Sequence, residues 1–331
     1  MKAMKLDARE THWWIDSPEP GLRLFLRHMP PAEGVPPTGV VLYVHGGTFP
    51  SALSIAHRFD GRSWRDELCQ AGFHVWGLDF HGFGRLSDPY PAMAEPAEAH
   101  APLGRAAEAS QQLEAAVRFI RAQHAAPAVS IIAHSWGTIV SGVFAGRRPD
   151  WVDRMVFFGP IARRDPDKRQ PALPGWRLIT LQAQWERFTA DVPADAAPVL
   201  DRQHFADWGE AYLDCDPDSR TREPPAVQTP SGAFQDIFDA WDGRLAYDPG
   251  LICKPVLIVR GAWDGMCTDA DAAWLFDALA NAPIRRDVKI SRGTHLMHLE
   301  ESRYALYREA ETFPKARDVV PAKPEEVPCS P

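Results

Sequence analysis

The stretch IIAHSWGTIV, residues 131–140, places a serine between an apolar run and a series of small residues. The apolar, β-branched run at 129–133 predicts a short central strand, and TIVSGVFA at 138–145 predicts a helix. Between them, AHSWG matches the pattern G-x-S-x-G with alanine at its first position. A serine at such a sharp strand-to-helix turn is held in a strained conformation, with its hydroxyl exposed above the sheet. The pentapeptide also fits an ordinary turn with a capping serine, so the rest of the chain has to decide.

The composition is that of an ordinary soluble globular protein. The chain has 331 residues, of which 45% are hydrophobic and 24% are charged. That length suffices for one large α/β domain, with or without a smaller insertion. The net charge is −8 and no Lys/Arg-rich run is present, which argues against a nucleic-acid partner.

The five cysteines are scattered and never form a C-x-x-C pair. Free thiols in a reducing compartment fit this spacing better than a disulfide framework or a zinc site. The N-terminal MKAMKLDARETHWW lacks the apolar core of a signal peptide, and no run approaches the ~18 apolar residues of a membrane helix. We therefore expect a cytoplasmic protein without membrane association, metal ion or cofactor. The sequence does not indicate its oligomeric state.

Strand-like and helix-like segments alternate along the first half of the chain. Two paired opening strands are expected at 12–16 and 22–29; further strands follow at 39–45, 73–80, 129–133 and 153–158, with helices at 63–70, 105–124 and 138–145. This alternation predicts an α/β fold, in which crossover helices cover both faces of a mostly parallel sheet.

The alternation stops at residues 162–251, a segment rich in proline, aspartate and aromatic residues. We interpret it as an inserted, mostly helical cap. Residues 1–161 and 252–315 then form the two parts of the core, and residues 316–331 are expected to be a disordered tail. In the second part we expect a strand at 254–261, a helix at 269–279, a strand at 286–290 and a helix at 302–313 that stops at Pro314.

Acyl transfer by a serine needs a base in reach of the hydroxyl and a buried acid that orients this base. In doubly wound folds, such groups meet at the carboxyl ends of the strands. The candidate acid is Asp264, in GAWDG directly after the strand at 254–261, and Asp165 and Asp271 are rivals. The candidate base is His295, in GTHLMH after the last strand.

Two other histidines stand near these positions. His298 follows His295 by three residues, and we expect it to pack or hydrogen-bond locally. His134 precedes Ser135 and should point back into the sheet.

The reaction also needs two N–H donors for the developing oxyanion. Residues 45–48, HGGT, follow the strand at 39–45, and glycines there let the backbone turn its N–H groups toward the serine. We assign the donors to the N–H groups of Gly47 and Trp136. A plain glycine-rich turn is the alternative.

The chain order Ser135, Asp264, His295 is that of the α/β-hydrolases. Together with HGGT, AHSWG, DFHGFG at 79–84, and GTHLMHLE at 293–300, it resembles the α/β-hydrolase superfamily over residues 12–314, in particular its cap-bearing esterases and proline iminopeptidase-like enzymes. The resemblance implies that Ser135 is the nucleophile. HGGTF departs from the HGGPG expected of proline iminopeptidases. A serine at the turn, in place of aspartate, departs from haloalkane dehalogenases and epoxide hydrolases.

The expected activity is hydrolysis of a carboxylic ester of a small to medium, partly apolar substrate through an acyl-enzyme. The same triad also serves amide, lactone, thioester and C–C bond hydrolysis. A non-catalytic ligand receptor and a cofactor-free oxygenase on this fold are alternatives of other classes.

Candidate substrate contacts come from two regions. Thr48 adjoins the glycine turn, and the loop at 49–63 carries His57 and Arg58, although it also fits a solvated surface loop. Nine aromatic residues lie between Trp176 and Trp241, among them Trp185, Trp208 and Phe238. We expect most of them to form the cap's own core, but a cap of this size has too little interior for all nine, so some should line an apolar pocket above Ser135.

Overall fold

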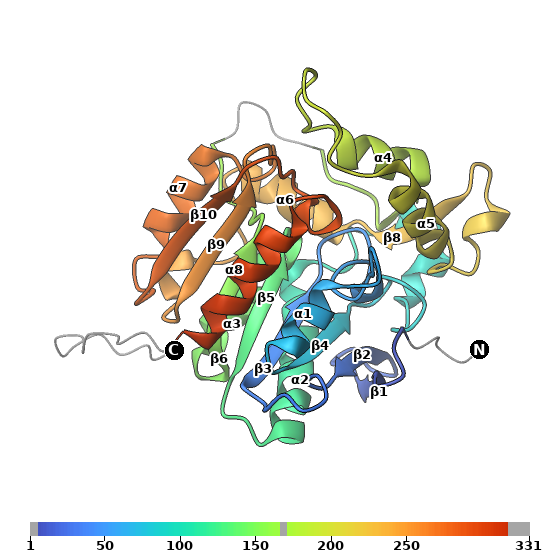
Figure 1. The fold of residues 1–331 in the computed structure, drawn as a ribbon. Coiled ribbons are helices and arrows are strands. Elements are labelled where there is room, and N and C mark those ends of the chain that lie inside the picture. Colours follow the sequence, from blue (N-terminus) through green and yellow to red (C-terminus); the bar gives the residue numbers. More distant parts are fainter. Residues whose placement is uncertain (1–5, 166–170, 317–331) are drawn as a thin grey trace.

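The computed structural model describes residues 6–165 and 171–316. A central sheet of eight strands runs through the molecule in the order β1-β2-β4-β3-β5-β6-β9-β10 (Figure 1). The strands are β1 (Thr11–Asp16), β2 (Arg23–Met29), β3 (Gly39–Val44), β4 (Phe73–Asp79), β5 (Val129–His134), β6 (Val152–Phe158), β9 (Val256–Gly261) and β10 (Arg285–Ile290). β2 pairs antiparallel with β1 and β4, and the other pairs are parallel. The expected α/β fold is confirmed.

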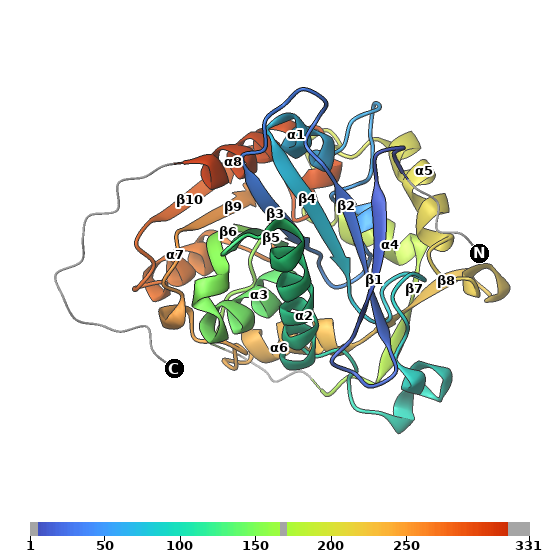
Figure 2. The ribbon, with the colours of Figure 1, turned by 90° about the horizontal axis from the view of Figure 1, so that it is seen from below.

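Helices cover both faces of this sheet (Figure 2). α1 (Trp64–Gln70) and α8 (Arg303–Lys315) lie on one face, and α2 (Ala106–His124), α3 (Trp136–Arg147) and α7 (Asp269–Ala278) lie on the other. Short 3-10 helices occur at Ser51–Leu53, Pro91–Ala94, Ala97–Ala99, Pro149–Trp151, Ser219–Thr221, Pro249–Leu251 and Met297–Leu299.

The continuous apolar runs of the central strands follow from this double cover. In β3, Val41 and Tyr43 pack in the cluster beneath α1 and α8, whereas Leu42 and Val44 pack in the cluster beneath α2 and α3. All four side chains are fully buried. Because successive side chains point to opposite faces of a strand, both faces need apolar residues.

The inserted segment contains α4 (Leu181–Thr189), α5 (Arg202–Leu213) and α6 (Gly232–Trp241). It also contains a separate antiparallel sheet of β7 (Trp176–Thr180) and β8 (Ala226–Pro230), which the sequence did not indicate. Each of these strands has only five residues, and polar side chains interrupt both of them, WRLIT and AVQTP, so neither shows the apolar run of a central strand.

The insertion does not stand apart from the core as one unit. α4 and α5 share an aromatic cluster that contacts the loops at the carboxyl ends of the strands. α6 instead packs against α2 and α3, and it contributes Ala233, Ile237 and Ala240 to the main core.

Three details differ from expectation or lie outside it. α8 continues through Pro314 to Lys315, so Pro314 lies inside the last turn and does not stop the helix. Cys69, Cys215 and Cys267 are free thiols as expected, but Cys253 is disulfide-bonded. The expected tail falls at 317–331, outside the described residues. None of the helices in the described part of the chain is both long and apolar enough to cross a bilayer.

Candidate active site

Ser135 stands at the sharp turn between β5 and α3. Its φ of 56° and ψ of −126° lie in a region that costs a residue with a side chain on the order of 1–3 kcal/mol. The turn is tight because α3 begins directly against the end of β3. A Cβ on Gly137 would lie 2.6 Å from the carbonyl oxygens of both Val44 and His45, so only glycine fits there. The strain and the close packing are those expected of a nucleophile turn.

The structure brings the three predicted side chains together. His295 Nε2 lies 2.8 Å from Ser135 Oγ, and His295 Nδ1 lies 3.0 Å from each carboxylate oxygen of Asp264. All three residues are buried, with exposed fractions of 5% for Ser135, 2% for His295 and 4% for Asp264. These distances allow a proton to pass from the hydroxyl to the imidazole while the carboxylate orients the ring.

Asp264 is held in place by its own loop. Its Oδ1 accepts hydrogen bonds from the backbone N–H groups of Met266 and Cys267, both at 2.9 Å. The rival acids are used elsewhere, because Asp271 caps α7 and pairs with Arg164, while Asp165 is exposed.

The loop carrying His295 is fixed at two points. Glu300 accepts hydrogen bonds from both the backbone N–H and the hydroxyl of Thr294, the residue before His295. Burial raises the pKa of Glu300 to about 7. On the other side, His134 Nε2 lies 3.0 Å from the His295 carbonyl oxygen and donates to it. His134 therefore does more than fill the sheet interior, which the sequence did not reveal.

His298 is packed and unpaired. It lies against His134 and Phe158, and its ring stacks on Phe49. Both of its ring nitrogens are buried without a hydrogen-bond partner in the described structure. Burial, followed by the charge of nearby groups, holds its pKa well below the usual range. Of the two expected local roles, packing or hydrogen bonding, the ring has the first.

Gly159, at the end of β6, adjoins the same histidine. Its φ is 53°, and a Cβ placed on it would lie 2.9 Å from His295 Nδ1 and 3.0 Å from Asp264 Oδ2. A side chain here would therefore crowd the contact between base and acid. No local sequence pattern marks this glycine, because its role arises only when β6 and β9 lie side by side.

The predicted donor turn adjoins the serine. A Cβ on Gly46 would lie 3.2 Å from Ser135 Cβ, and one on Gly47 would lie 4.0 Å from Trp136 Cβ and 2.9 Å from Ala233 Cβ in α6. Trp136 is the first residue of α3, so its N–H has no partner within that helix. Its indole Nε1 donates to Asp236 of α6 at 2.8 Å.

The predicted substrate contacts separate into two places. Thr48 is buried beside the turn and accepts a hydrogen bond from Arg187 of α4 at 2.8 Å. His57 and Arg58 instead line a cavity of about 350 Å³ that none of the triad residues lines. The Arg58 guanidinium is paired with Asp7 and Asp66, which accounts for its position without a ligand.

The cap aromatics mostly form a core. Trp208 is 1% exposed, donates its Nε1 to the Leu53 carbonyl and stacks on Tyr212. Trp185 is half-buried against Phe205, and Phe238 packs on the main core from α6.

Metal-ligating residues lie elsewhere. In the described ranges, the cluster able to share a metal ion is His28, His74 and His124. His74 is at the start of β4, whereas the triad lies beyond the opposite, carboxyl ends of the parallel strands.

Comparisons with known proteins identify the family and the fold. The model of the serine aminopeptidase family, S33, matches residues 36–302, whereas no curated protein sequence matches the chain. A thioesterase domain from the curacin biosynthetic pathway has a TM-score of 0.59 at 14% identity, covering 91% of this chain and 98% of that one. An esterase from Thermogutta terrifontis has a TM-score of 0.55 at 16% identity, covering 92% and 97%.

A Vigna radiata epoxide hydrolase mutant has a TM-score of 0.56 at 14% identity, covering 92% of this chain and 98% of that one. At these identities the structural matches show a common fold, and their different activities show that the fold alone does not fix the reaction. The family match covers most of the chain, and it shows that this protein is a hydrolase belonging to the serine aminopeptidase S33 family of the α/β-hydrolases.

Proposed function

We propose that the protein is a serine hydrolase that cleaves a carboxylic ester of a small to medium, partly apolar substrate through an acyl-enzyme. The observation that carries this proposal is the hydrogen-bonded series from Ser135 Oγ to His295 Nε2 at 2.8 Å and from His295 Nδ1 to Asp264 at 3.0 Å. It lies at a strained turn, where a serine with a merely structural role would have no reason to be.

In this mechanism, Ser135 attacks the ester carbonyl while His295 accepts its proton. His295 then gives that proton to the departing alkoxide, which leaves as the alcohol. Asp264 holds the imidazole in the tautomer that presents its Nε2 lone pair to the serine, and it stabilises the imidazolium that forms. Water, deprotonated by His295, hydrolyses the acyl-enzyme and regenerates Ser135.

We assign the stabilisation of the oxyanion to hydrogen bonds from the N–H groups of Gly47 and Trp136. Both residues lie beside Ser135, which supports this assignment. The N–H of Trp136 is also the first of α3 and has no partner in the helix, and the positive end of the helix dipole stabilises a negative charge there. Removing one such donor typically slows an acyl-transfer enzyme by ~10²–10³-fold.

An ester is favoured over an amide because an alkoxide needs less protonation to leave than an amine does. Thioesters, lactones, amides and C–C bonds are other substrates for the same residues. A panel in which one acyl group is presented as ester, thioester, lactone and amide separates them by kcat/KM.

The test of the serine mechanism is covalent labelling by a fluorophosphonate probe, followed by mass spectrometry of the labelled peptide. Wild type should gain one adduct on Ser135, and Ser135→Ala should gain none. Ser141→Ala is the matched control, because Ser141 is a buried serine further along α3. If the wild-type protein remains unlabelled while it turns over esters, the serine mechanism is wrong. If the wild-type protein is neither labelled nor active on any ester, the hypothesis of a ligand receptor or of a cofactor-free oxygenase replaces the serine-hydrolase proposal. A measurement of oxygen consumption separates these two hypotheses.

A further inference from the structure

A cationic side chain from the cap lies beside the glycine turn. Arg187 of α4 donates from Nη2 to Thr48 Oγ1 at 2.8 Å, and from Nε and Nη2 to Gln184 Oε1 at 3.2 and 2.9 Å. Thr48 directly follows Gly47, whose backbone adjoins Trp136. The guanidinium is therefore a short distance from the position assigned to the reacting carbonyl.

This cation has no carboxylate partner among the residues that the structure describes. Its hydrogen-bond acceptors, Thr48 and Gln184, are both neutral. Burial lowers the pKa of Arg187 to about 10, which leaves it charged at neutral pH. Arg187 is half-buried, and an arginine that is partly removed from water is normally paired with a carboxylate. Arg58 shows the usual arrangement, since two aspartates surround it.

The residue that holds the guanidinium also has an unsatisfied polar atom. Gln184 accepts from Arg187 through its Oε1, while its Nε2 is buried without a hydrogen-bond partner in the described chain. A buried amide nitrogen normally has a partner, so this unpaired group beside the cation points to a polar ligand.

We infer that Arg187 binds a carboxylate carried by the substrate, so that the preferred ester has an anionic group a few bonds from its scissile carbonyl. This inference rests on the proposed ester hydrolysis. A guanidinium offers a carboxylate two parallel hydrogen bonds and opposite charge, which fixes both its position and its orientation. Gln184, which accepts from the guanidinium, holds it in place.

The test compares esters that carry a carboxylate with neutral esters of similar length, in which an alkyl group replaces the carboxylate. Monomethyl glutarate and methyl pentanoate place the difference on the acyl side, and butyryloxyacetate and propyl butyrate place it on the alcohol side. Hydrolysis is followed by pH-stat for wild type, Arg187→Met and Arg187→Lys. Arg202→Met is the control, because Arg202 is an exposed cap arginine that lies over Trp185.

We expect wild type to hydrolyse at least one anionic ester more than tenfold faster, in kcat/KM, than its neutral counterpart. Arg187→Met should lose about 100-fold on that anionic ester and less than threefold on the neutral one, whereas Arg187→Lys should retain part of the preference. Arg202→Met should behave as wild type does. Equal loss on both members of a pair, or a wild-type preference for both neutral esters, overturns the inference. Hydrolysis that survives Ser135→Ala would instead overturn the proposed function itself.

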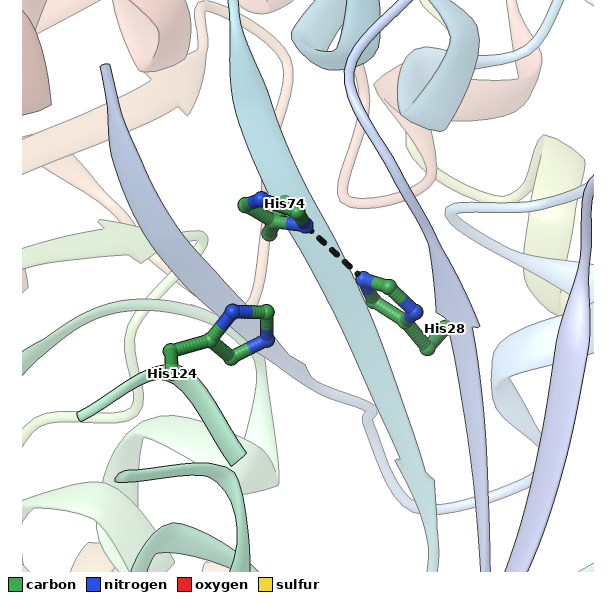
Figure 3. Close-up of side chains that lie close together, drawn as sticks. All are labelled: His28, His74 and His124. Atoms are coloured by element: carbon green, nitrogen blue, oxygen red, sulfur yellow. Dashed lines mark hydrogen bonds between the residues drawn. The ribbon is translucent and has the colours of Figure 1, made fainter. Parts of the chain in front are cut away.

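A second, independent observation concerns the opposite end of the sheet. His28 of β2, His74 of β4 and His124 at the end of α2 converge there, and one nitrogen of each lies within 4.8 Å of the others (Figure 3). His28 Nε2 and His74 Nδ1 are 3.1 Å apart. Two nitrogens bound at ~2.0–2.1 Å to a tetrahedral zinc ion are separated by about 3.4 Å, so this pair needs little adjustment.

The surroundings of His28 prepare its imidazole as a ligand, whereas His124 must first give up a hydrogen bond. Thr11 Oγ1 lies 3.2 Å from His28 Nδ1 and can accept its proton, which leaves the lone pair on Nε2. Neutral imidazole is the form that binds metal. Trp76 Nε1 donates to His124 Nε2 at 2.9 Å, and this bond must be given up when His124 binds a metal.

We propose that His28, His74 and His124 form a structural site for a divalent transition-metal ion such as Zn²⁺. The ion would connect the antiparallel edge of the sheet to the end of α2, remote from the triad. Three imidazoles suit zinc, nickel and copper, and would discriminate against magnesium and calcium.

The test is calorimetric titration of the untagged, full-length protein with Zn²⁺, with thermal unfolding measured in parallel. Wild type should bind one ion and unfold at a higher temperature with Zn²⁺. His74→Ala and His124→Ala should weaken zinc binding at least tenfold and abolish the rise in unfolding temperature. His100→Ala is the control and should do neither, because among the described residues His100 pairs with Glu95. Undiminished binding in both cluster variants, or no binding in wild type, overturns the proposal. Activity should be insensitive to chelators in every case.

Discussion

Gly159→Ala adds one methyl group at the contact between the proposed base and acid. The new carbon would lie 2.9 Å from His295 Nδ1 and 3.0 Å from Asp264 Oδ2, whereas ordinary contacts of a Cβ begin at 3.4 Å. The imidazole and the carboxylate must each move away by about half an ångström. Because their hydrogen bond is 3.0 Å long, such a displacement weakens it and turns the imidazole away from Ser135.

The expected loss in kcat follows from two limits. A misplacement of about 1 Å in a catalytic site costs ~10²-fold, and removal of the orienting carboxylate costs ~10⁴-fold. We expect Gly159→Ala to lie between them, at ~10²–10³-fold. The φ of 53° adds a stability loss of about 1–2 kcal/mol, because alanine is disfavoured in the left-handed region.

Gly34→Ala provides the matched control. Gly34 has a φ of 76°, but a Cβ there would meet nothing within 4 Å. It should show a similar stability loss and full activity. Ester hydrolysis is measured at saturating substrate, and unfolding by urea at the same temperature. If Gly159→Ala retains kcat within threefold of Gly34→Ala, the contact between His295 and Asp264 does not matter for turnover, and the assigned roles are wrong.

Three further predictions concern the same residues. Ser135→Ala should lower kcat by ~10⁴–10⁶-fold with an unchanged unfolding midpoint, and retention of a tenth of the rate would exclude Ser135 as the nucleophile. His295→Ala should lower kcat as much as Ser135→Ala does, and the double variant should be no worse than either single variant. His298→Ala should remain nearly fully active. If His298→Ala is instead the more damaging of the two histidine variants in a kcat assay, His298 is the base. In the folded protein Glu300 keeps its proton up to a pH of about 7, whereas in the unfolded chain its pKa has the ordinary value of 4.5. The free energy of unfolding should therefore fall by about 3 kcal/mol as the pH rises through that interval. Glu300→Gln should remove this part of the pH dependence. The free energy of unfolding is measured with urea at pH 5 and pH 8. If it changes by the same amount between the two pH values in wild type and in Glu300→Gln, the assignment is wrong.

The triad candidates could be predicted from sequence because each lies in the loop or turn that follows a strand of the parallel sheet. Ser135 and Asp264 follow the buried strands β5 and β9, and His295 follows the more exposed strand β10; parallel strands bring such positions to one edge of the sheet. The rivals fail for reasons that need coordinates. His298 is three residues from His295 in sequence, but its ring packs beneath Phe49 and not toward the serine hydroxyl.

Contacts between distant segments could not be predicted. Arg187 reaches Thr48 across 139 residues, and nothing in the surrounding helix sequence distinguishes it from a solvated arginine. Conversely, Arg58 stands in a loop whose sequence is compatible with substrate binding, but its guanidinium is hydrogen-bonded to Asp66 and Asp7. These aspartates lie 8 and 51 residues away in the sequence. β7 and β8 were missed because their pairing, and not their own composition, defines them.

The hydrogen bond between Trp136 and Asp236 bears on how this protein could be rebuilt or could have diversified. Asp236 of α6 also accepts from Arg105 and from the backbone of Ala106, so one cap residue braces the nucleophile turn and the start of α2 together. A chimera that exchanges the whole segment at 162–251 would therefore disturb the turn as well as the lining of the site. Exchange of 171–231 alone leaves Asp236 with its three partners. Exchange of residues 171–231, about two-thirds of the insertion, is thus compatible with the chemistry, and α6 is inherited with the core.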